Sequence, residues 1–259
     1  MSSLYDVTEK GVQPNPLKPT PSTKTSKEYI NMFKKDFQYK VISDDPNELV
    51  CLLSNIDVSI ANAIRRILLA DVPTMAIETV YIDQNTSITH DEVLSHRLGL
   101  MPVLADPTEF EVGGDEDTDW NTLVFQAHCK KSNGTDHAKF SPVCTASYRM
   151  LPVIKMLDNV RGEDAEELCT LEPGVFKLIE KDGEVEAVID DPMKCTMSRN
   201  YLMNPRLKSK IKIERSGRDF IFCIESVGQV EPKKLLKRAV QILKEKGERL
   251  VRVLEEEGN

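Results

Sequence analysis

The 259-residue sequence lacks the features that mark membrane-spanning and secreted proteins. No apolar run approaches the roughly 18 residues that a membrane-spanning helix needs. The polar start of the chain shows no secretory signal, and the six cysteines lie at least 15 positions apart without a CxxC pair. Cysteines in this arrangement are typical of reduced, buried thiols. We therefore expect an intracellular protein with no membrane segment, no cofactor and no bound metal.

Catalytic motifs are also absent from the sequence. It contains no GxGxxG, no GxxxxGK followed by Ser or Thr, and no GxSxG. His90 and His96 are about 240° apart around a helix and cannot share one metal ion. The stretch DHAKFSP, residues 136–142, combines an acid, a histidine and a lysine, but no nucleophile or phosphate loop lies nearby. We interpret it as a surface recognition loop of a non-enzymatic protein, with His137 and Lys139 as candidate contact residues.

Charge and composition restrict the remaining classes of protein. The net charge is −8 and no long segment is strongly basic, which disfavours direct binding of nucleic acid. Hydrophobic residues make up 40% of the chain, enough for one good-sized core or two modest ones. Residues 1–35, rich in Pro, Lys, Ser and Thr, are expected to form a flexible tail. Residues 109–119 hold six acidic side chains and predict an exposed loop.

The hydrophobic periodicity predicts a chain that mixes helices and strands, an α+β fold. Strands are expected at residues 48–53 and 75–83, and hairpins at 176–189, around Asp182-Gly183, and at 210–226, around Ser216-Gly217. Three helices are expected: one that stops before Pro73, a short one at 89–99 with Thr89 and Glu92 as a capping box, and a long one from Pro232.

The first of these helices carries two adjacent arginines, Arg65 and Arg66, in an otherwise apolar run. Its apolar stripe at helical spacing consists of Ile60, Ile64, Ile67 and Leu68. Consecutive residues lie about 100° apart around a helix, so at least one arginine projects away from the core. Two interpretations stay open: a solvated basic edge, or a pair of cations that docks a large acidic partner.

The last helix carries a heptad seam of residues spaced alternately four and three apart. The seam residues are Leu236, Val240, Leu243, Gly247, Leu250 and Leu254. Glycine inside a helix costs about 1 kcal/mol of helix propensity relative to alanine, which indicates that something approaches the backbone closely at Gly247. The seam is typical either of a long core helix or of a helix shared with a partner subunit, and we favour the second interpretation.

Three stretches together resemble the alpha-type assembly subunits of cellular RNA polymerases. They are SIANAIRRILLADVPTMAIETVYID, THDEVLSHRLGLMPV and FIFCIESVGQVEPKKLLKRAVQIL. Within that family, DHAKFSPVCTASYRMLP and GEDAEEL are most similar to the larger alpha-like subunit shared by eukaryotic RNA polymerases I and III. The resemblance extends from about residue 33 to the end of the chain.

The resemblance implies a non-catalytic assembly subunit of the nucleus, present in both nucleolus and nucleoplasm. Its dimerisation domain, a sheet with helices, would consist of residues 36–104 and 206–259, with an inserted, mostly β domain at residues 105–205. The six seam residues would form the heterodimer interface with a smaller alpha-like subunit. Arg65, Arg66, His137 and Lys139 would contact the second-largest catalytic subunit, since arginine can bridge carboxylates and carbonyls across an interface. Other small polymerase subunits are expected partners, and DNA only indirectly through the complex.

Two departures from the family pattern affect this expectation. The RNA polymerase II relative usually carries a cluster of zinc-binding cysteines in the inserted domain, and the absence of one here favours the I and III subunit. The segment that begins at Leu123 runs almost directly into QAHCKKSNGTDHAKF, so the inserted domain looks shortened. A polymerase II or archaeal paralogue and a freestanding enzyme remain as alternatives.

Overall fold

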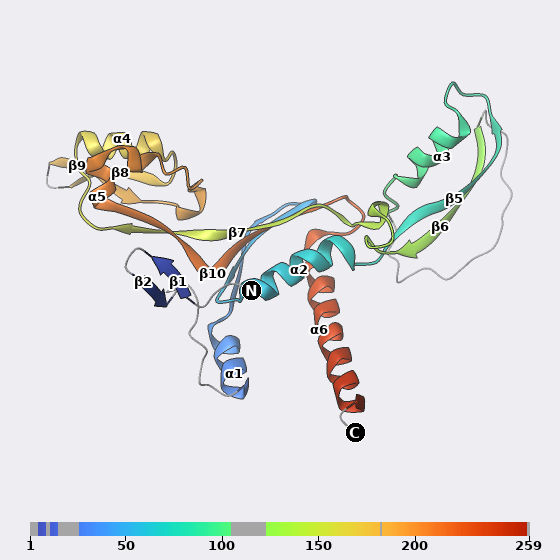
Figure 1. Cartoon of the computed structure of the whole chain (residues 1–259). Helices are drawn as coiled ribbons and strands as arrows, with labels where there is room; N and C mark the ends of the chain where they lie inside the picture. The colour runs from blue at the N-terminus through green and yellow to red at the C-terminus, as the bar shows by residue number, and fades with distance from the viewer. Residues whose placement is uncertain (1–4, 9–10, 15–25, 105–122, 182, 258–259) are drawn as a thin grey trace. The chain divides into compact units, whose positions relative to one another are not determined.

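The structure of the protein is a computed structural model that describes residues 5–8, 11–14, 26–104, 123–181 and 183–257. The chain divides into two compact units, each with helices and antiparallel strands, and the predicted α+β class is confirmed (Figure 1). Unit 1 consists of Met1–Gln38, Leu53–Asp57 and Arg149–Ile221, and unit 2 of Tyr39–Leu52, Val58–Tyr148 and Phe222–Asn259. Among the described helices, none combines the length and the hydrophobicity of a membrane-spanning segment. The acidic segment 109–119 lies outside the described residues.

The described helices and strands include the elements that the sequence signals most clearly. The helices are α1 (Ser26–Asp36), α2 (Val58–Ala70), α3 (Asp91–Gly99), α4 (Glu163–Leu171), α5 (Pro205–Lys210) and α6 (Pro232–Glu257). The strands are β1 (Tyr5–Thr8), β2 (Gly11–Pro14), β3 (Gln38–Asp44), β4 (Glu48–Ser54), β5 (Thr74–Asn85), β6 (Leu123–Ser132), β7 (Val143–Met156), β8 (Phe176–Lys181), β9 (Glu184–Ile189) and β10 (Ile211–Ser226). Short 3-10 turns are η1 (Ala138–Phe140), η2 (Pro192–Lys194) and η3 (Asn200–Met203). The strands expected at 48–53 and 75–83, the hairpin at 176–189 and the long last helix are confirmed.

The core of unit 2 combines side chains from strands and helices. The largest sheet has the strand order β3-β4-β10-β7. Along β4 every second side chain is buried, as the alternation of a strand with one covered face predicts. Helix α2 packs against α6, and its buried residues are Ala61, Ile64, Ile67 and Leu68. The apolar stripe expected for α2 is therefore correct except at Ile60, which is only half-buried.

A long antiparallel ribbon also belongs to unit 2. Strand β5 pairs with β6 from Thr74, opposite Ser132, to Asn85, opposite Leu123. Helix α3 packs against β5 (Figure 1), yet none of its residues is buried. The ribbon and α3 therefore carry a surface that their own unit does not cover.

Unit 1 is built from the hairpin β8–β9 and helices α4 and α5. The hairpin turn includes Gly183, whose φ of +79° is a left-handed conformation that glycine adopts without strain. One hydrophobic cluster of buried side chains lies in this unit, with Val160, Ala165, Leu168, Val175, Phe176, Ala187, Cys195, Tyr201, Leu207 and Ile211.

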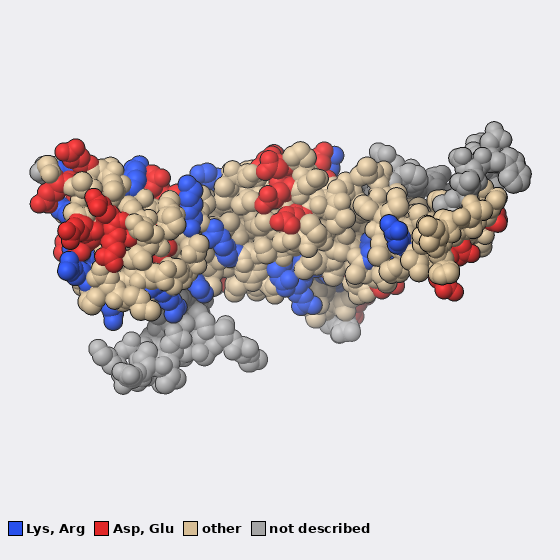
Figure 2. Space-filling view, turned by 90° about the horizontal axis from the view of Figure 1, so that it is seen from above, with Lys and Arg blue, Asp and Glu red and all other residues tan. Residues whose placement is uncertain are grey.

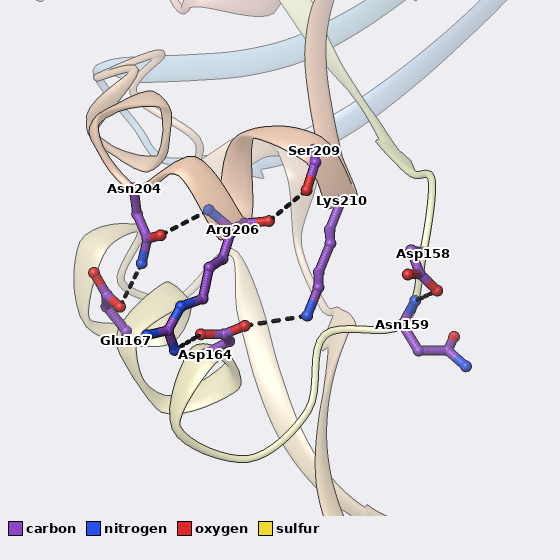
Figure 3. Close-up of polar contacts among 8 residues, drawn as sticks. All are labelled: Asp158, Asn159, Asp164, Glu167, Asn204, Arg206, Ser209 and Lys210. Carbon is purple, nitrogen blue, oxygen red and sulfur yellow. Dashed lines mark hydrogen bonds and ion pairs between the residues drawn. The ribbon is translucent and has the colours of Figure 1, made fainter.

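Polar contacts fix α4 to α5 (Figure 3). Asp164 accepts hydrogen bonds from Arg206 at 3.4 Å and from Lys210 at 3.1 Å. Asn204, the N-cap of α5, accepts from the amide of Arg206 at 2.9 Å and donates to Glu167 at 2.7 Å. The other acidic side chains of α4 face solvent, and Figure 2 shows carboxylates gathered over this part of unit 1, at the left of the view.

The hairpin expected at residues 210–226 is wrong. Ile211–Ser226 is one continuous strand, β10, within which the Ser216 hydroxyl donates to Asp219 at 2.5 Å. Gly217 is not among the described glycines with a positive φ. Strand β10 has a hydrogen-bonded neighbour on each side, β4 and β7, and this pairing outweighs the local turn preference of Ser-Gly.

The capping box expected at the start of α3 is also wrong. The helix begins at Asp91, with His90 as an N-cap that makes no side-chain capping bond. Asn85, at the end of β5, holds the helix start instead. Its amide donates to the Thr89 carbonyl at 2.8 Å and to the Asp91 carboxylate at 2.6 Å.

The N-terminal region contains regular structure that the prediction of a flexible tail over residues 1–35 does not anticipate. Strand β1 pairs with β2, and α1 occupies Ser26–Asp36. The unit boundaries after residues 148 and 221 also differ from the limits 105 and 205 expected for the inserted domain. Residues 123–148 belong to unit 2, where β6 pairs with β5. The domain limits taken from the family resemblance stay a prediction.

Candidate functional site

Arg65 and Arg66 lie on the part of α2 that the core leaves uncovered. Arg66 is exposed, and Arg65 is half-buried with its Nε donating to Asn62 Oδ1, one turn earlier, at 3.0 Å. Within the described part of the chain neither guanidinium has a carboxylate partner. The bond to Asn62 orients Arg65 without neutralising it, so both positive charges are available to a partner.

The loop before η1 is tied to the C-terminal end of α2. Thr135 donates to the Ala70 carbonyl through its amide and through its hydroxyl, each at 3.1 Å. At Gly134 the two backbones approach so closely that an added Cβ would lie 2.2 Å from the Leu69 carbonyl oxygen. Glycine is required there because no side chain fits. These contacts attach the recognition loop DHAKFSP to the helix that carries the two arginines.

His137 and Lys139 have different surroundings within that loop. His137 is exposed, and its Nδ1 accepts from the Lys139 amide at 3.1 Å, which caps η1. The Lys139 ammonium turns into the chain, where it donates to the Ile77 carbonyl at 2.9 Å and lies 2.5 Å from Glu78 Oε2. The hydrogen bond from Lys139 lowers the pKa of Glu78 below its usual value. Lys139 therefore anchors the loop to β5 with its charge already paired, whereas His137 remains accessible.

A depression of about 380 Å³ lies beside this loop. Its lining includes His137 and Lys139 from the loop, Ile77 and Glu78 from β5, and Glu92, Ser95 and His96 from α3. The lining combines charges of both signs with apolar groups, which is the mixture found at the edges of protein–protein interfaces. The loop, the ribbon and α3 thus form one continuous surface.

The first third of α6 belongs to the core of unit 2. Leu235, Leu236 and Ala239 are exposed by 9% or less. Leu236, one of the six residues expected at the heterodimer interface, therefore packs inside its own chain. Further along the helix, Lys246 Nζ lies 2.8 Å from an oxygen of Asp71, the residue that follows α2.

Beyond Leu236 the heptad seam is uncovered. Val240 is 49% exposed, Leu250 60% and Leu254 61%, while Leu243 is half-buried. A shallow groove along this face is lined by apolar groups of Val240, Leu243, Gly247 and Val251. A Cβ added at Gly247 would have no atom within 4 Å in the rest of the described chain. Packing within the chain therefore does not require glycine at this position.

A second uncovered apolar surface, on α3 and the ribbon, is missing from the sequence-based prediction. Tyr81 is 56% exposed, Val93 51% and Leu104 81%. The signal that could have indicated it is the run LGLMPVL, residues 98–104, which continues apolar past the end of the helix. A helix that covered only its own strand would not need it.

The sequence of this chain matches a known protein family and several named relatives. The sequence profile of the RNA polymerase Rpb3/Rpb11 dimerisation domain matches residues 51–246. The Dictyostelium discoideum protein named DNA-directed RNA polymerases I and III subunit rpac1 is 34% identical, over 84% of this chain and 81% of the relative. The Homo sapiens protein named DNA-directed RNA polymerases I and III subunit RPAC1 is 35% identical, over 82% of each chain. The D. discoideum protein named DNA-directed RNA polymerase II subunit rpb3 is 24% identical, over 84% of this chain and 94% of the relative.

Proposed function

Because this chain belongs to the RNA polymerase Rpb3/Rpb11 dimerisation family, and within it to the group of RNA polymerase I and III subunits, we propose that it is a non-catalytic assembly subunit of both polymerases. It pairs with a smaller alpha-like subunit and docks the second-largest catalytic subunit. It contacts DNA only through the complex, in keeping with its net charge of −8. It acts in the nucleus, in the nucleolus with polymerase I and in the nucleoplasm with polymerase III.

The uncovered half of α6 is the observation that carries the pairing proposal. Burying a leucine or valine side chain contributes about 1.5–3 kcal/mol relative to leaving it in water. Val240, Leu250 and Leu254 are each about half exposed or more, so this free energy is available only on association. The alternation of four and three residues along the seam matches the packing of another helix.

The surroundings of the seam also fit a partner helix. At Gly247 the groove has no side chain, and a partner backbone can approach closely there. Lys244, Glu248 and Arg252 border the groove with charges of both signs. Such charges at the rim of an apolar interface select the partner and its register more than they add affinity.

The arginine pair supports the docking part of the proposal. Arg65 and Arg66 present two guanidinium groups that no carboxylate of the described chain neutralises. Guanidinium groups bind carboxylates in a bidentate geometry, so an acidic segment of the second-largest subunit is the partner that they favour. The accessible His137, on the loop attached to the end of α2, extends the same surface.

Two relatives from one organism favour polymerases I and III over polymerase II. In D. discoideum the I and III subunit is 34% identical to this chain, and the polymerase II subunit is 24% identical. Both alignments cover 84% of this chain, so the difference does not come from coverage.

Affinity purification of the tagged chain from its own cells tests the proposal. Mass spectrometry of the purified material should identify the largest subunits of polymerases I and III, with one smaller alpha-like subunit in equal amount. Recovery of the polymerase II largest subunit alone would show instead that the chain is the polymerase II paralogue. An enzymatic activity of the chain on its own would contradict a non-catalytic role.

A further inference from the structure

Four side chains that can ligate a metal meet on one face of the largest sheet, within unit 2. Cys223 and Glu225 alternate with buried residues along β10, so they lie on the face opposite those residues. Glu48 belongs to β4 and Cys144 to β7, the two strands that flank β10. The sheet therefore brings together residues from three neighbouring strands.

The ligand atoms of Glu48, Cys223 and Glu225 are close enough to bind one ion. Cys223 Sγ lies 3.4 Å from Glu48 Oε1, and Cys144 Sγ lies 3.5 Å from Glu225 Oε2. One ligand atom from each of Glu48, Cys223 and Glu225 lies within 4.8 Å of the other two. Ligands at about 2.0–2.3 Å from a tetrahedral zinc ion are roughly 3.3–3.8 Å from one another. Small side-chain rotations would bring the three ligands to that spacing.

Among the described residues, no cationic side chain balances the charges of the cluster. In the described part of the chain, neither Glu48 nor Glu225 forms an ion pair with a lysine, arginine or histidine. Each carboxylate instead accepts a hydrogen bond from a thiol, which is a weak donor. The two carboxylates repel each other at this separation, and both are half-buried, where solvent screens them less than on an open surface. A bound divalent cation would remove this repulsion.

We propose that Glu48, Cys223 and Glu225 bind one Zn²⁺ ion, with Cys144 beside Glu225 at the edge of the site. Zinc accepts both thiolate sulfur and carboxylate oxygen, whereas Mg²⁺ and Ca²⁺ prefer oxygen alone. On binding, the Cys223 thiol releases its proton to solvent and its sulfur bonds to the metal. The ion would join β4 to β10 and stabilise the sheet. The expectation of no metal misses this cluster because Glu48 and Cys223 are 175 positions apart in the sequence.

Zinc protection of the thiols tests the site in the wild-type chain. The full chain, with the subunits that accompany it, is stripped of metal, titrated with Zn²⁺ and treated with N-ethylmaleimide. Peptide mass spectrometry then gives the alkylation rate of each cysteine separately. At a zinc concentration ten times the dissociation constant, about one site in eleven is empty, so alkylation of Cys223 should slow about tenfold. Cys129, exposed on β6, serves as the internal control and should react at an unchanged rate.

Carboxamide variants identify the oxygen ligands. Glu48→Gln and Glu225→Gln preserve shape, and each should raise the zinc concentration needed to protect Cys223 by at least about tenfold. Glu180→Gln, an exposed position on β8, is the matched control and should leave protection unchanged. The proposal is overturned if Zn²⁺ does not slow alkylation of Cys223, if it slows Cys129 equally, or if both variants protect Cys223 as the wild type does.

Discussion

Lys246 on α6 and Asp71, just beyond α2, form an ion pair with 2.8 Å between Nζ and Oδ2. The pair lies seven residues past Ala239, the last fully buried residue of α6. A partly exposed pair of this kind contributes only about 0–1 kcal/mol to stability. The pair therefore adds a contact between the exposed half of α6 and the end of α2, while the buried residues at the start of α6 fix the helix in unit 2.

Replacing Leu250 with aspartate should abolish pairing without unfolding the chain. Leu250 is 60% exposed, so the free chain tolerates a carboxylate there. In the heterodimer the same carboxylate would be buried without a partner, at a cost of several kcal/mol, which weakens binding at least about a hundredfold. Titration calorimetry with the smaller subunit measures the effect. Gln241→Asp adds the same charge away from the groove and should pair normally, whereas undiminished pairing of Leu250→Asp would show that the seam faces elsewhere.

Replacing Arg65 and Arg66 together with alanine should leave folding and pairing intact but weaken capture of the second-largest subunit. Arg66 is exposed and Arg65 makes only one hydrogen bond, to Asn62, so the two substitutions should change stability by no more than about 1 kcal/mol. Loss of a buried interfacial arginine costs about 2 kcal/mol or more, so two losses weaken capture at least about a hundredfold even without full additivity. A pull-down at matched concentrations compares the double variant with the wild type and with Arg215→Ala, an exposed control. Equal recovery by all three proteins would favour the alternative interpretation, that Arg65 and Arg66 form a solvated basic edge without a docking role.

Gly134→Ala should destabilise the recognition loop. The new Cβ would lie 2.2 Å from the Leu69 carbonyl oxygen, and a backbone atom cannot move away cheaply. Overpacking of this kind costs about 1–3 kcal/mol, measurable by urea unfolding. The same substitution at Gly247 meets no atom of the rest of the described chain and should add up to about 1 kcal/mol of helix stability while it weakens pairing. A Gly134→Ala variant as stable as the wild type would mean that the loop moves aside.

The acid stability of unit 1 should depend on Glu214. Its carboxylate lies 2.7 Å from Lys155 and 2.6 Å from Lys212, and hydrogen bonds from both hold its pKa at about 2, below the usual 4.5. Because the pKa is lower in the folded chain, these pairs stabilise the folded state above pH 4.5, and the contribution is lost as the pH falls toward 2. Glu214→Gln should therefore lose less thermal stability than the wild type over this range. Glu180→Gln should follow the wild type, and a parallel loss in all three proteins would refute the assignment.

Sequence reasoning located helices and strands whose signal lies within one segment, although the equally local capping box at Thr89 and Glu92 was wrong. The apolar spacing of α2 and α6 and the hairpin at Gly183 depend on residues within one element. Asp182-Gly183 and Ser216-Gly217 are similar dipeptides, yet Gly183 lies in a turn between β8 and β9, whereas Ser216 and Gly217 lie inside β10. The second lies in a strand with a neighbour on each side, and the strand order that decides this is not determined by a single sequence.

The candidate site likewise has features that the sequence predicts and features that depend on tertiary contacts. The spacing of the seam is visible in the sequence, but the burial of Leu236 depends on how α6 packs in the folded chain. The ion pair of Lys139 with Glu78 joins residues 61 positions apart, and no periodicity indicates it. Contacts between residues so far apart in the sequence form only in the folded chain. The sequence therefore predicts candidate residues without showing which of them already bind other groups of the same chain.

The uncovered half of α6 links the lifetime of the protein to the supply of its partner. A chain synthesised in excess keeps Leu250, Val251 and Leu254 in water, and chaperones and proteases act on apolar surfaces of this kind. A chain that pairs through α6, as proposed above, hides the same residues. Removal of the surplus would therefore equalise the amounts of the two subunits without a dedicated regulator, and the scarcer subunit would set the number of polymerase cores that a cell can begin to build.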